Sequence, residues 1–239
     1  GAVAGILAGS ATGAVLASLM TEAALESWGW RIPFVFGLVV GLAGFVLRHG
    51  LEEAPAPNKL GSPLATVLKR HRLLLVRLGG LAALNSIGFY VMFVYVVSWL
   101  QFADGMAPAQ ALDINTVSMV VLLPAMIAMG WLSDRLGRKP VMLFAAIVAV
   151  VAAWPLFWLM HDPSPWRALA GQMGFVLVLG AYMGCQPAMM VEAAPAEVRC
   201  TAIALGFNVT MGVLGGLSPL VATWLVERTG NDYSPSFMI

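Results

Sequence analysis

Residues 116–160 read TVSMVVLLPAMIAMGWLSDRLGRKPVMLFAAIVAVVAAWPLFWLM, in which two long apolar runs flank a short charged segment. Apolar runs of about 17–25 residues cross the hydrocarbon core of a bilayer as α-helices. Neither run alternates apolar and polar residues with the period of two that a barrel strand requires. The stretch therefore predicts two membrane-spanning helices joined by a cytoplasmic turn.

The remainder of the chain repeats this pattern. Of the 239 residues, 60% are hydrophobic and only 10% are charged, whereas about 25% are charged in a soluble domain. Helices satisfy their backbone hydrogen bonds internally, as lipid requires. We therefore predict an all-α, polytopic membrane protein with seven spanning helices. Their expected positions are 1–20, 33–47, 78–100, 116–132, 141–160, 168–191 and 201–226.

Basic residues predict how the helices are threaded, because Lys and Arg concentrate in cytoplasmic loops. One set of alternate loops holds only Arg31, Arg167 and Arg228 of the 13 basic residues. The other set holds Arg48, Lys59, Lys69, Arg70, Arg72, Arg77, Arg135, Arg138, Lys139 and Arg199. We therefore expect both ends of this chain on the outer side of the membrane.

The longest polar stretch, residues 48–72, contains prolines and charges of both signs, which exclude a membrane span. It predicts a cytoplasmic linker at 48–77, between two helices in 1–47 and five helices in 78–239. From Pro63 onward the linker forms either a short surface helix whose basic residues meet lipid phosphates or a solvated loop. Gly1 already stands in an apolar run, so we expect further helices outside this chain.

The charged segment between the two central runs is GWLSDRLGRKP, Gly130–Pro140. Gly137 permits a tight turn, and Pro140 suits the first turn of the next helix. Asp134, an acid at a membrane boundary, needs a cationic partner or a helix N-terminus. A simple positive-inside anchor explains the basic residues but not the complete spacing G-x-L-S-D-R-x-G-R-K, which resembles the loop signature of the major facilitator superfamily.

Further segments support this resemblance. EAAPAEVR, Glu192–Arg199, is similar to the corresponding loop between later helices of that superfamily. In relatives, the charges of the two loops pair when the cytoplasmic side closes, which implies the pairs Asp134–Arg199 and Arg138–Glu192. The implied cytoplasmic gate consists of Gly130, Asp134, Arg135, Gly137, Arg138, Lys139, Glu192 and Arg199.

The segment WGWRIPF, residues 28–34, followed by LRHGLEE, resembles the metabolite:proton symporter branch, which carries proline and betaine, 2-oxoglutarate, citrate or shikimate. On this resemblance the chain corresponds to the fifth to eleventh of twelve helices, and the linker joins two six-helix halves. The implied function is alternating-access transport of a small solute by proton symport in a bacterial inner membrane.

Polar side chains inside the apolar blocks are candidates for solute binding. A buried amide must meet a partner helix or a cavity, because an unsatisfied amide is costly in lipid. The superfamily's cavity is lined by the helices that correspond to 78–100 and 168–191, which favours Asn85, Tyr95, Tyr182 and Gln186. For Asn208 we prefer an interhelical hydrogen bond.

Small residues predict close helix packing in the first block, where Gly5, Gly9 and Gly13 recur every four residues. No carboxylate or histidine falls inside a predicted span, so proton coupling rests on the resemblance alone.

Other functions remain to be weighed. An efflux antiporter of the same superfamily usually carries a Gly-Pro pair in the fifth helix, and GILAGSATGAV, residues 5–15, has no proline. A seven-helix receptor or structural membrane protein would explain the helices but not the gate motifs, and a retinal protein needs an intramembrane lysine, whereas Lys59, Lys69 and Lys139 lie in loops. No cluster has metal or triad spacing, so we expect no enzyme, metal or cofactor, and a net charge of +1 indicates no nucleic-acid partner.

Overall fold

The computed structural model describes residues 2–49, 62–162 and 164–239. Helices account for all regular secondary structure in these ranges, in agreement with the predicted all-α class. The chain divides into two compact units, residues 1–59 and 60–239. The central part of the predicted linker, 50–61, lies outside the described residues.

The first unit is a helical hairpin. It contains α1 (Ala2–Leu19), the short α2 (Glu22–Ser27), a 3-10 turn η1 (Gly29–Arg31) and α3 (Ile32–His49). A Cβ at Gly29 would lie 2.8 Å from Met20 Cε, so a larger residue at this reversal would displace the end of the Met20 side chain. Within this unit, a Cβ at Gly5, Gly9 or Gly13 would meet no described atom within 4 Å. The predicted packing role of these glycines therefore stays a prediction.

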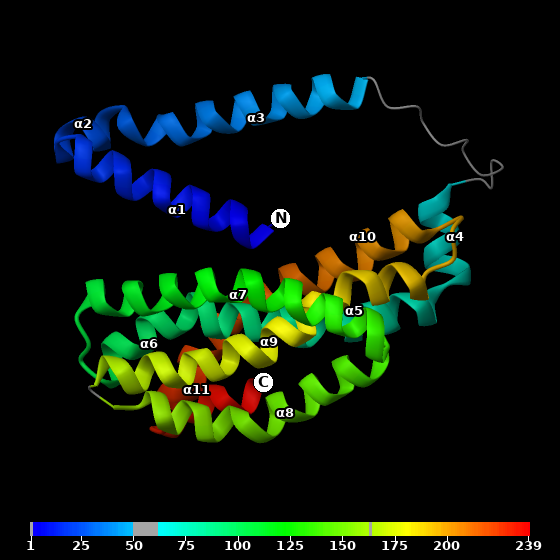
Figure 1. The fold of residues 1–239 in the computed structure, drawn as a ribbon. Helices are drawn as coiled ribbons and strands as arrows, with labels where there is room; N and C mark the ends of the chain where they lie inside the picture. The colour runs from blue at the N-terminus through cyan, green and yellow to red at the C-terminus, as the bar shows by residue number, and fades with distance from the viewer. Residues whose placement is uncertain (1, 50–61, 163) are drawn as a thin grey trace. The chain divides into compact units, whose positions relative to one another are not determined.

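The second unit contains one short helix and five long helical segments (Figure 1). The short helix is α4 (Pro63–Arg70). The long segments are α5 (Arg72–Tyr90) with η2 (Val91–Tyr95) and α6 (Val96–Ala103), α7 (Pro108–Leu136), α8 (Arg138–Met160), α9 (Pro165–Ala193), and α10 (Arg199–Thr210) with η3 (Met211–Gly215) and α11 (Gly216–Thr229); a 3-10 turn, η4 (Ser234–Met238), follows.

Six helical stretches of the described residues are long and apolar enough to cross a membrane: Gly29–Leu47, Arg72–Ala103, Pro108–Leu136, Arg138–Met160, Pro165–Ala193 and Arg199–Thr229. They correspond to the second to seventh predicted spans. The first predicted span coincides with α1, which forms a helix but is not among these six. The predicted total of seven therefore remains a prediction.

The linker's second part is a helix, as one of the two alternatives expected. Ser62 caps α4, since its Oγ accepts a hydrogen bond from the Ala65 amide at 3.4 Å. Val67 is fully buried against α10, in a cluster with Val198 and Ala202. Lys69 and Arg70 occupy the last turn, where positive charge is favourable.

Helix α9 is the most buried span of the second unit and packs against both α7 and α8 (Figure 1). The α7–α9 crossing is close: a Cβ added at Gly184 would lie 2.4 Å from the Met126 carbonyl oxygen. A Cβ at Gly130 would lie 3.2 Å from the Gly184 carbonyl oxygen. Gly130, predicted as part of the gate loop, thus also lies where two helix backbones meet.

Two of the long segments change to π-helical winding near their middle, at η2 and η3. These turns belong to one packed pair, because α5 contacts α10 and η3, and η2 contacts α11. A Cβ at Gly215 in η3 would lie 2.8 Å from Tyr90 Cδ2. The π-turns are therefore placed where the two segments pack together, and such turns often mark functional positions.

Candidate functional site

The turn between α7 and α8 is made by Gly137, whose φ of 92° favours glycine. Arg138, the first residue of α8, lies directly beyond this turn. Its Nε lies 2.5 Å from Glu192 Oε1 at the end of α9, and its Nη2 lies 2.9 Å from Asp134 Oδ1. Its Nη1 also donates to Ser133 Oγ at 3.3 Å. The Arg138 guanidinium therefore links the α7–α8 turn to the C-terminal end of α9.

The predicted contact between Arg138 and Glu192 is present, but the predicted contact between Asp134 and Arg199 is not. Asp134 binds Arg138 instead, because the two are four residues apart across the Gly137 turn. Arg199 Nε donates to the Ala194 carbonyl at 3.1 Å. In this structure Arg199 therefore supports its own loop rather than the opposite one.

The two remaining basic residues of the predicted gate differ in their surroundings. Arg135 stacks on Trp131, with Cζ 3.8 Å from the ring centroid, a favourable cation–π distance. Lys139 forms no ion pair within the described part of the chain. Arg138 is thus the residue that connects the helices here.

Three of the four predicted cavity residues form a single buried cluster between α5 and α9. Asn85 Nδ2 donates to Gln186 Oε1 at 2.6 Å, while Gln186 Nε2 and the Tyr182 hydroxyl both donate to the Leu81 carbonyl, at 3.1 and 3.0 Å. Asn85 is 5% exposed and Gln186 2%. These side chains bind one another in this structure, so the cluster joins two helices.

One acceptor of this cluster is unused. Asn85 Oδ1 is buried and has no hydrogen-bond partner among the described residues. An amide oxygen left unpaired in a low-dielectric interior carries a desolvation cost. It is therefore an unpaired acceptor in the interior of the second unit.

A second amide cluster, not predicted from the sequence, surrounds the π-turn η2. Gln172 Nε2 donates to the Met92 carbonyl at 3.0 Å and to Asn115 Oδ1 at 3.1 Å. Asn115 Nδ2 donates to the Phe93 carbonyl at 3.2 Å. Two amides from α7 and α9 thus bind carbonyls of the π-turn. The available signal was the presence of two amides in otherwise apolar helices.

A third cluster, also missed, lies at the opposite end of the bundle from the α7–α8 turn. Asp104 Oδ1 lies 2.6 Å from His161 Nδ1, and Asp232 Oδ2 lies 3.9 Å from His161 Nε2. Burial raises the pKa of the Asp104 carboxyl, and His161 opposes this shift. The three residues come from three separate connections, so no local motif could reveal them.

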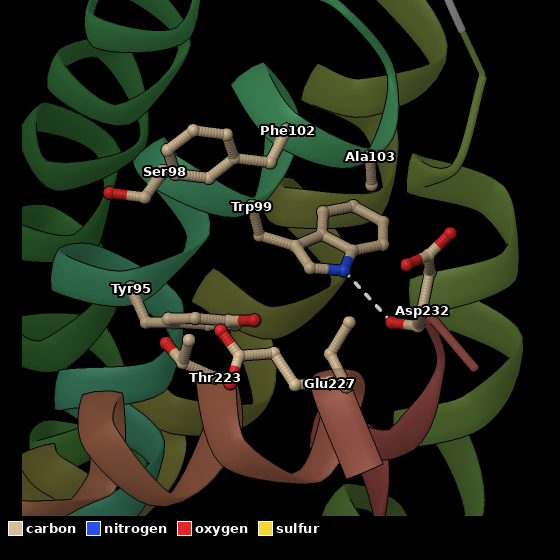
Figure 2. A pocket seen from close by; sticks show the side chains of 9 residues that line it. Tyr95, Ser98, Trp99, Phe102, Ala103, Thr223, Glu227 and Asp232 are labelled. Atoms are coloured by element: carbon tan, nitrogen blue, oxygen red, sulfur yellow. Dashed lines mark hydrogen bonds between the residues drawn. The ribbon is translucent and has the colours of Figure 1, made fainter. Parts of the chain in front are cut away.

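The fourth predicted cavity residue, Tyr95, belongs to neither amide cluster. It lines a pocket of about 500 Å³ beside the third cluster, together with Trp99 and Glu227 (Figure 2). Asn208 is exposed and makes no side-chain hydrogen bond within the described ranges, so its predicted interhelical bond remains a prediction.

A model of the Major Facilitator Superfamily matches residues 1–238. The chain belongs to the major facilitator superfamily. This confirms the resemblance that the loop motifs carried, and the six apolar spans accordingly make the chain an integral membrane protein.

Curated relatives of this major facilitator chain are named as transporters. It is 29% identical to the glycine betaine/proline/ectoine/pipecolic acid transporter OusA of Dickeya dadantii and 30% identical to the proline/betaine transporter of Escherichia coli, with all of the chain and 51% of each relative covered. It is 29% identical to the citrate-proton symporter of Klebsiella pneumoniae, with 97% of the chain and 54% of the relative covered. The chain therefore spans about half the length of these relatives. No solved structure matches it.

Proposed function

We propose that this chain is part of a secondary active transporter of a small organic acid, amino acid or betaine, driven by proton symport, and not an enzyme. It works in the bacterial inner membrane by alternating access, with its two ends on the outer side and the linker in the cytoplasm. Residues 1–47 end one half of the transporter, 48–77 form the linker, and 78–239 begin the other half. Its partners are the solute, protons and the bilayer.

The observation that carries this proposal is the ion cluster of Arg138, Asp134 and Glu192. The arginine connects the α7–α8 turn to the end of α9, on the side where basic residues concentrate. Both acids are more than half exposed, and exposed ion pairs contribute little net stability. A gate contact must form and break in each transport cycle, and a weak pair suits that task better than a buried one.

The buried amide cluster supports a second element of the mechanism. Asn85, Tyr182 and Gln186 hold α5 against α9, so these helices move as one body when the halves rock against each other. We retain Asn85 as a solute-contact candidate because its Oδ1 is an unpaired acceptor. We retain Tyr95 as a solute-contact residue because it lines an open pocket.

Uptake by the full-length protein tests this function. Cells lacking their own carriers would be supplied with labelled glycine betaine, proline or citrate, with and without an uncoupler. Uncoupler-sensitive accumulation of one of them is expected. Uptake that resists the uncoupler would exclude proton symport as the mechanism. Outward transport of accumulated solute would indicate an efflux antiporter. No transport in either direction would favour a non-transporting membrane protein.

A further inference from the structure

A pocket of about 500 Å³ opens where the last turn of α6 meets the end of α11 and the segment that leads to η4 (Figure 2). Because α7 runs from this end of the bundle to the Gly137 turn, the pocket lies at the end opposite the Arg138 cluster. Its lining residues are Tyr95, Ser98, Trp99, Phe102, Ala103, Thr223, Val226, Glu227 and Asp232.

Aromatic side chains form one wall of this pocket. Tyr95, Trp99 and Phe102 are four and three residues apart, a spacing that places them on one helix face. Trp99 is fixed, since its Nε1 donates to the Asp232 carbonyl at 2.8 Å and its ring packs edge-on against Phe157. Phe102, by contrast, is 89% exposed. The wall combines a fixed and nearly buried indole, 2% exposed, with the exposed ring of Phe102.

A carboxylate from α11 forms the opposite wall. Figure 2 shows the Glu227 carboxylate, from α11, on the same side of the hollow as Thr223 and facing Tyr95 and Trp99. Glu227 makes no hydrogen bond or ion pair within the described residues. Asp232 adds a second carboxylate near His161, on the side of the Trp99 indole, whose Nε1 donates to the Asp232 carbonyl. No Lys or Arg is among the lining residues.

This combination has a specific chemical preference. Faces of Tyr and Trp attract weakly hydrated organic cations, and quaternary ammonium groups are bound in this way by aromatic cages. A negatively charged hollow raises the local concentration of cations and opposes polyanions. The described residues hold no group of three or more His, Cys, Asp and Glu suited to a metal ion.

We propose that this pocket is an outer-side binding site for the ammonium group of a small zwitterionic solute. The proposal rests on the transport function above and deepens it, because it separates betaine-like and amino-acid solutes from tricarboxylates. Tyr95, Trp99 and Phe102 contact the ammonium methyl or methylene groups, and Glu227 balances the positive charge. The carboxylate of the solute points away from Glu227.

Labelling of a single cysteine tests the site without requiring transport. In full-length protein with Cys185, Cys200 and any cysteine outside this chain replaced by alanine, Ser98→Cys places a thiol on the pocket wall and leaves the three aromatic rings and both acids in place. Its rate of reaction with a maleimide is measured in proteoliposomes. The probes are tetramethylammonium, glycine betaine and citrate at equal ionic strength.

The matched control is Ala109→Cys, an exposed position in the first turn of α7 that lines no described pocket. Two further variants each remove one negative charge: Glu227→Gln at the pocket and Glu197→Gln at the opposite end of the bundle. Glu197 is exposed and follows α9 at the opposite end.

Tetramethylammonium and glycine betaine are expected to slow labelling at position 98, while citrate and the position-109 control show no protection. Glu227→Gln should weaken protection by about fivefold, the scale of an exposed ion pair, and Glu197→Gln should leave it unchanged. Equal protection by citrate, or none by either ammonium compound, overturns the proposal. The Ser98→Cys protein alone supplies this result if Glu227→Gln does not fold.

Uptake measured on the same preparations separates the two proposals. Glycine betaine uptake without protection at position 98 means that the pocket assignment is wrong and the transport function stands. Protection without uptake of any tested solute means that the ammonium site is present and the transport function is wrong.

Discussion

Asp104 and His161 lie 2.6 Å apart, carboxylate oxygen to Nδ1, although they belong to the connections that follow α6 and α8. The Asp104 side chain is only 3% exposed. Burial raises the pKa of this carboxyl despite the neighbouring imidazole, with Asp162 and Asp232 adding to the rise. The pair therefore links two loops through a group whose charge depends on pH.

The pH dependence of stability follows from this shift. Because the folded-state pKa of Asp104 lies above the unfolded value of about 3.9, the folded state binds the proton more tightly. Its stabilising contribution is complete below the unfolded pKa and is lost as pH rises through the folded pKa. In that window, the melting temperature of the wild type should fall with pH relative to that of Asp104→Asn.

Thermal unfolding in detergent at a series of pH values measures this difference. The control is Asp113→Asn, which removes an exposed acid near the start of α7, at the same end of the bundle as Asp104. It should keep the wild-type dependence of melting temperature on pH. A wild-type stability that rises with pH relative to Asp104→Asn would show that the shift has the opposite sign.

The Arg138 cluster should affect transport more than folding. Arg138→Ala removes the contacts to both Glu192 and Asp134 and is expected to reduce initial uptake by about fivefold or more, a typical size for a change in a conformational equilibrium. The charge-swapped double variant, Arg138→Glu with Glu192→Arg, should recover part of the uptake. Normal transport by Asp134→Asn would show that the Asp134 charge has no role in the gate.

The close α7–α9 crossing predicts a steep dependence on side-chain size at Gly184. In Gly184→Ala the new Cβ would lie 2.4 Å from the Met126 carbonyl oxygen, a backbone atom, so the two helices would have to shift apart. We expect a loss of about 1–3 kcal/mol in the free energy of unfolding. The control, Gly216→Ala, places its Cβ in open space and should be neutral or stabilising. Denaturant unfolding in mixed micelles compares the two.

The Asn85–Gln186 hydrogen bond should be measurable as a coupling energy. A double-mutant cycle with Asn85→Ala and Gln186→Ala is expected to give about 0.6–2 kcal/mol, the range found for interhelical bonds in membranes. The paired variant Asn85→Leu with Gln186→Leu should retain most of the stability, since no polar group is left unpaired. Additive single effects would indicate that the two amides do not interact.

Hydropathy located most of the helices, but it underestimated their length. The predicted run 116–132 is the centre of α7, which extends from Pro108 to Leu136. Its polar first turns, with Gln110 and Asp113, lack the apolar character that the prediction relied on, yet they continue the helix. Backbone hydrogen bonding favours continuation into the interface, where polar side chains meet water.

The partners of the polar residues were harder to predict than the residues themselves. Asn85 and Gln186 stood out as amides in apolar blocks, but whether they face a cavity or each other depends on how α5 and α9 are rotated. Arg138 forms the expected ion pair with Glu192. Asp134 also pairs with Arg138, and not with Arg199 as expected. Charge alone could not decide between Arg138 and Arg199 as the partner of Asp134.

Composition and local motifs thus account for the membrane location, the helical class, the turn at Gly137 and the family, because each depends on residues close together in the chain. The Asn85–Gln186 bond and the pocket beside Trp99 arise only when helices distant in sequence approach one another. That approach is set by backbone contacts such as the one at Gly184. A side chain's local sequence gives its chemistry, but the rotation and crossing of the helices give it a partner.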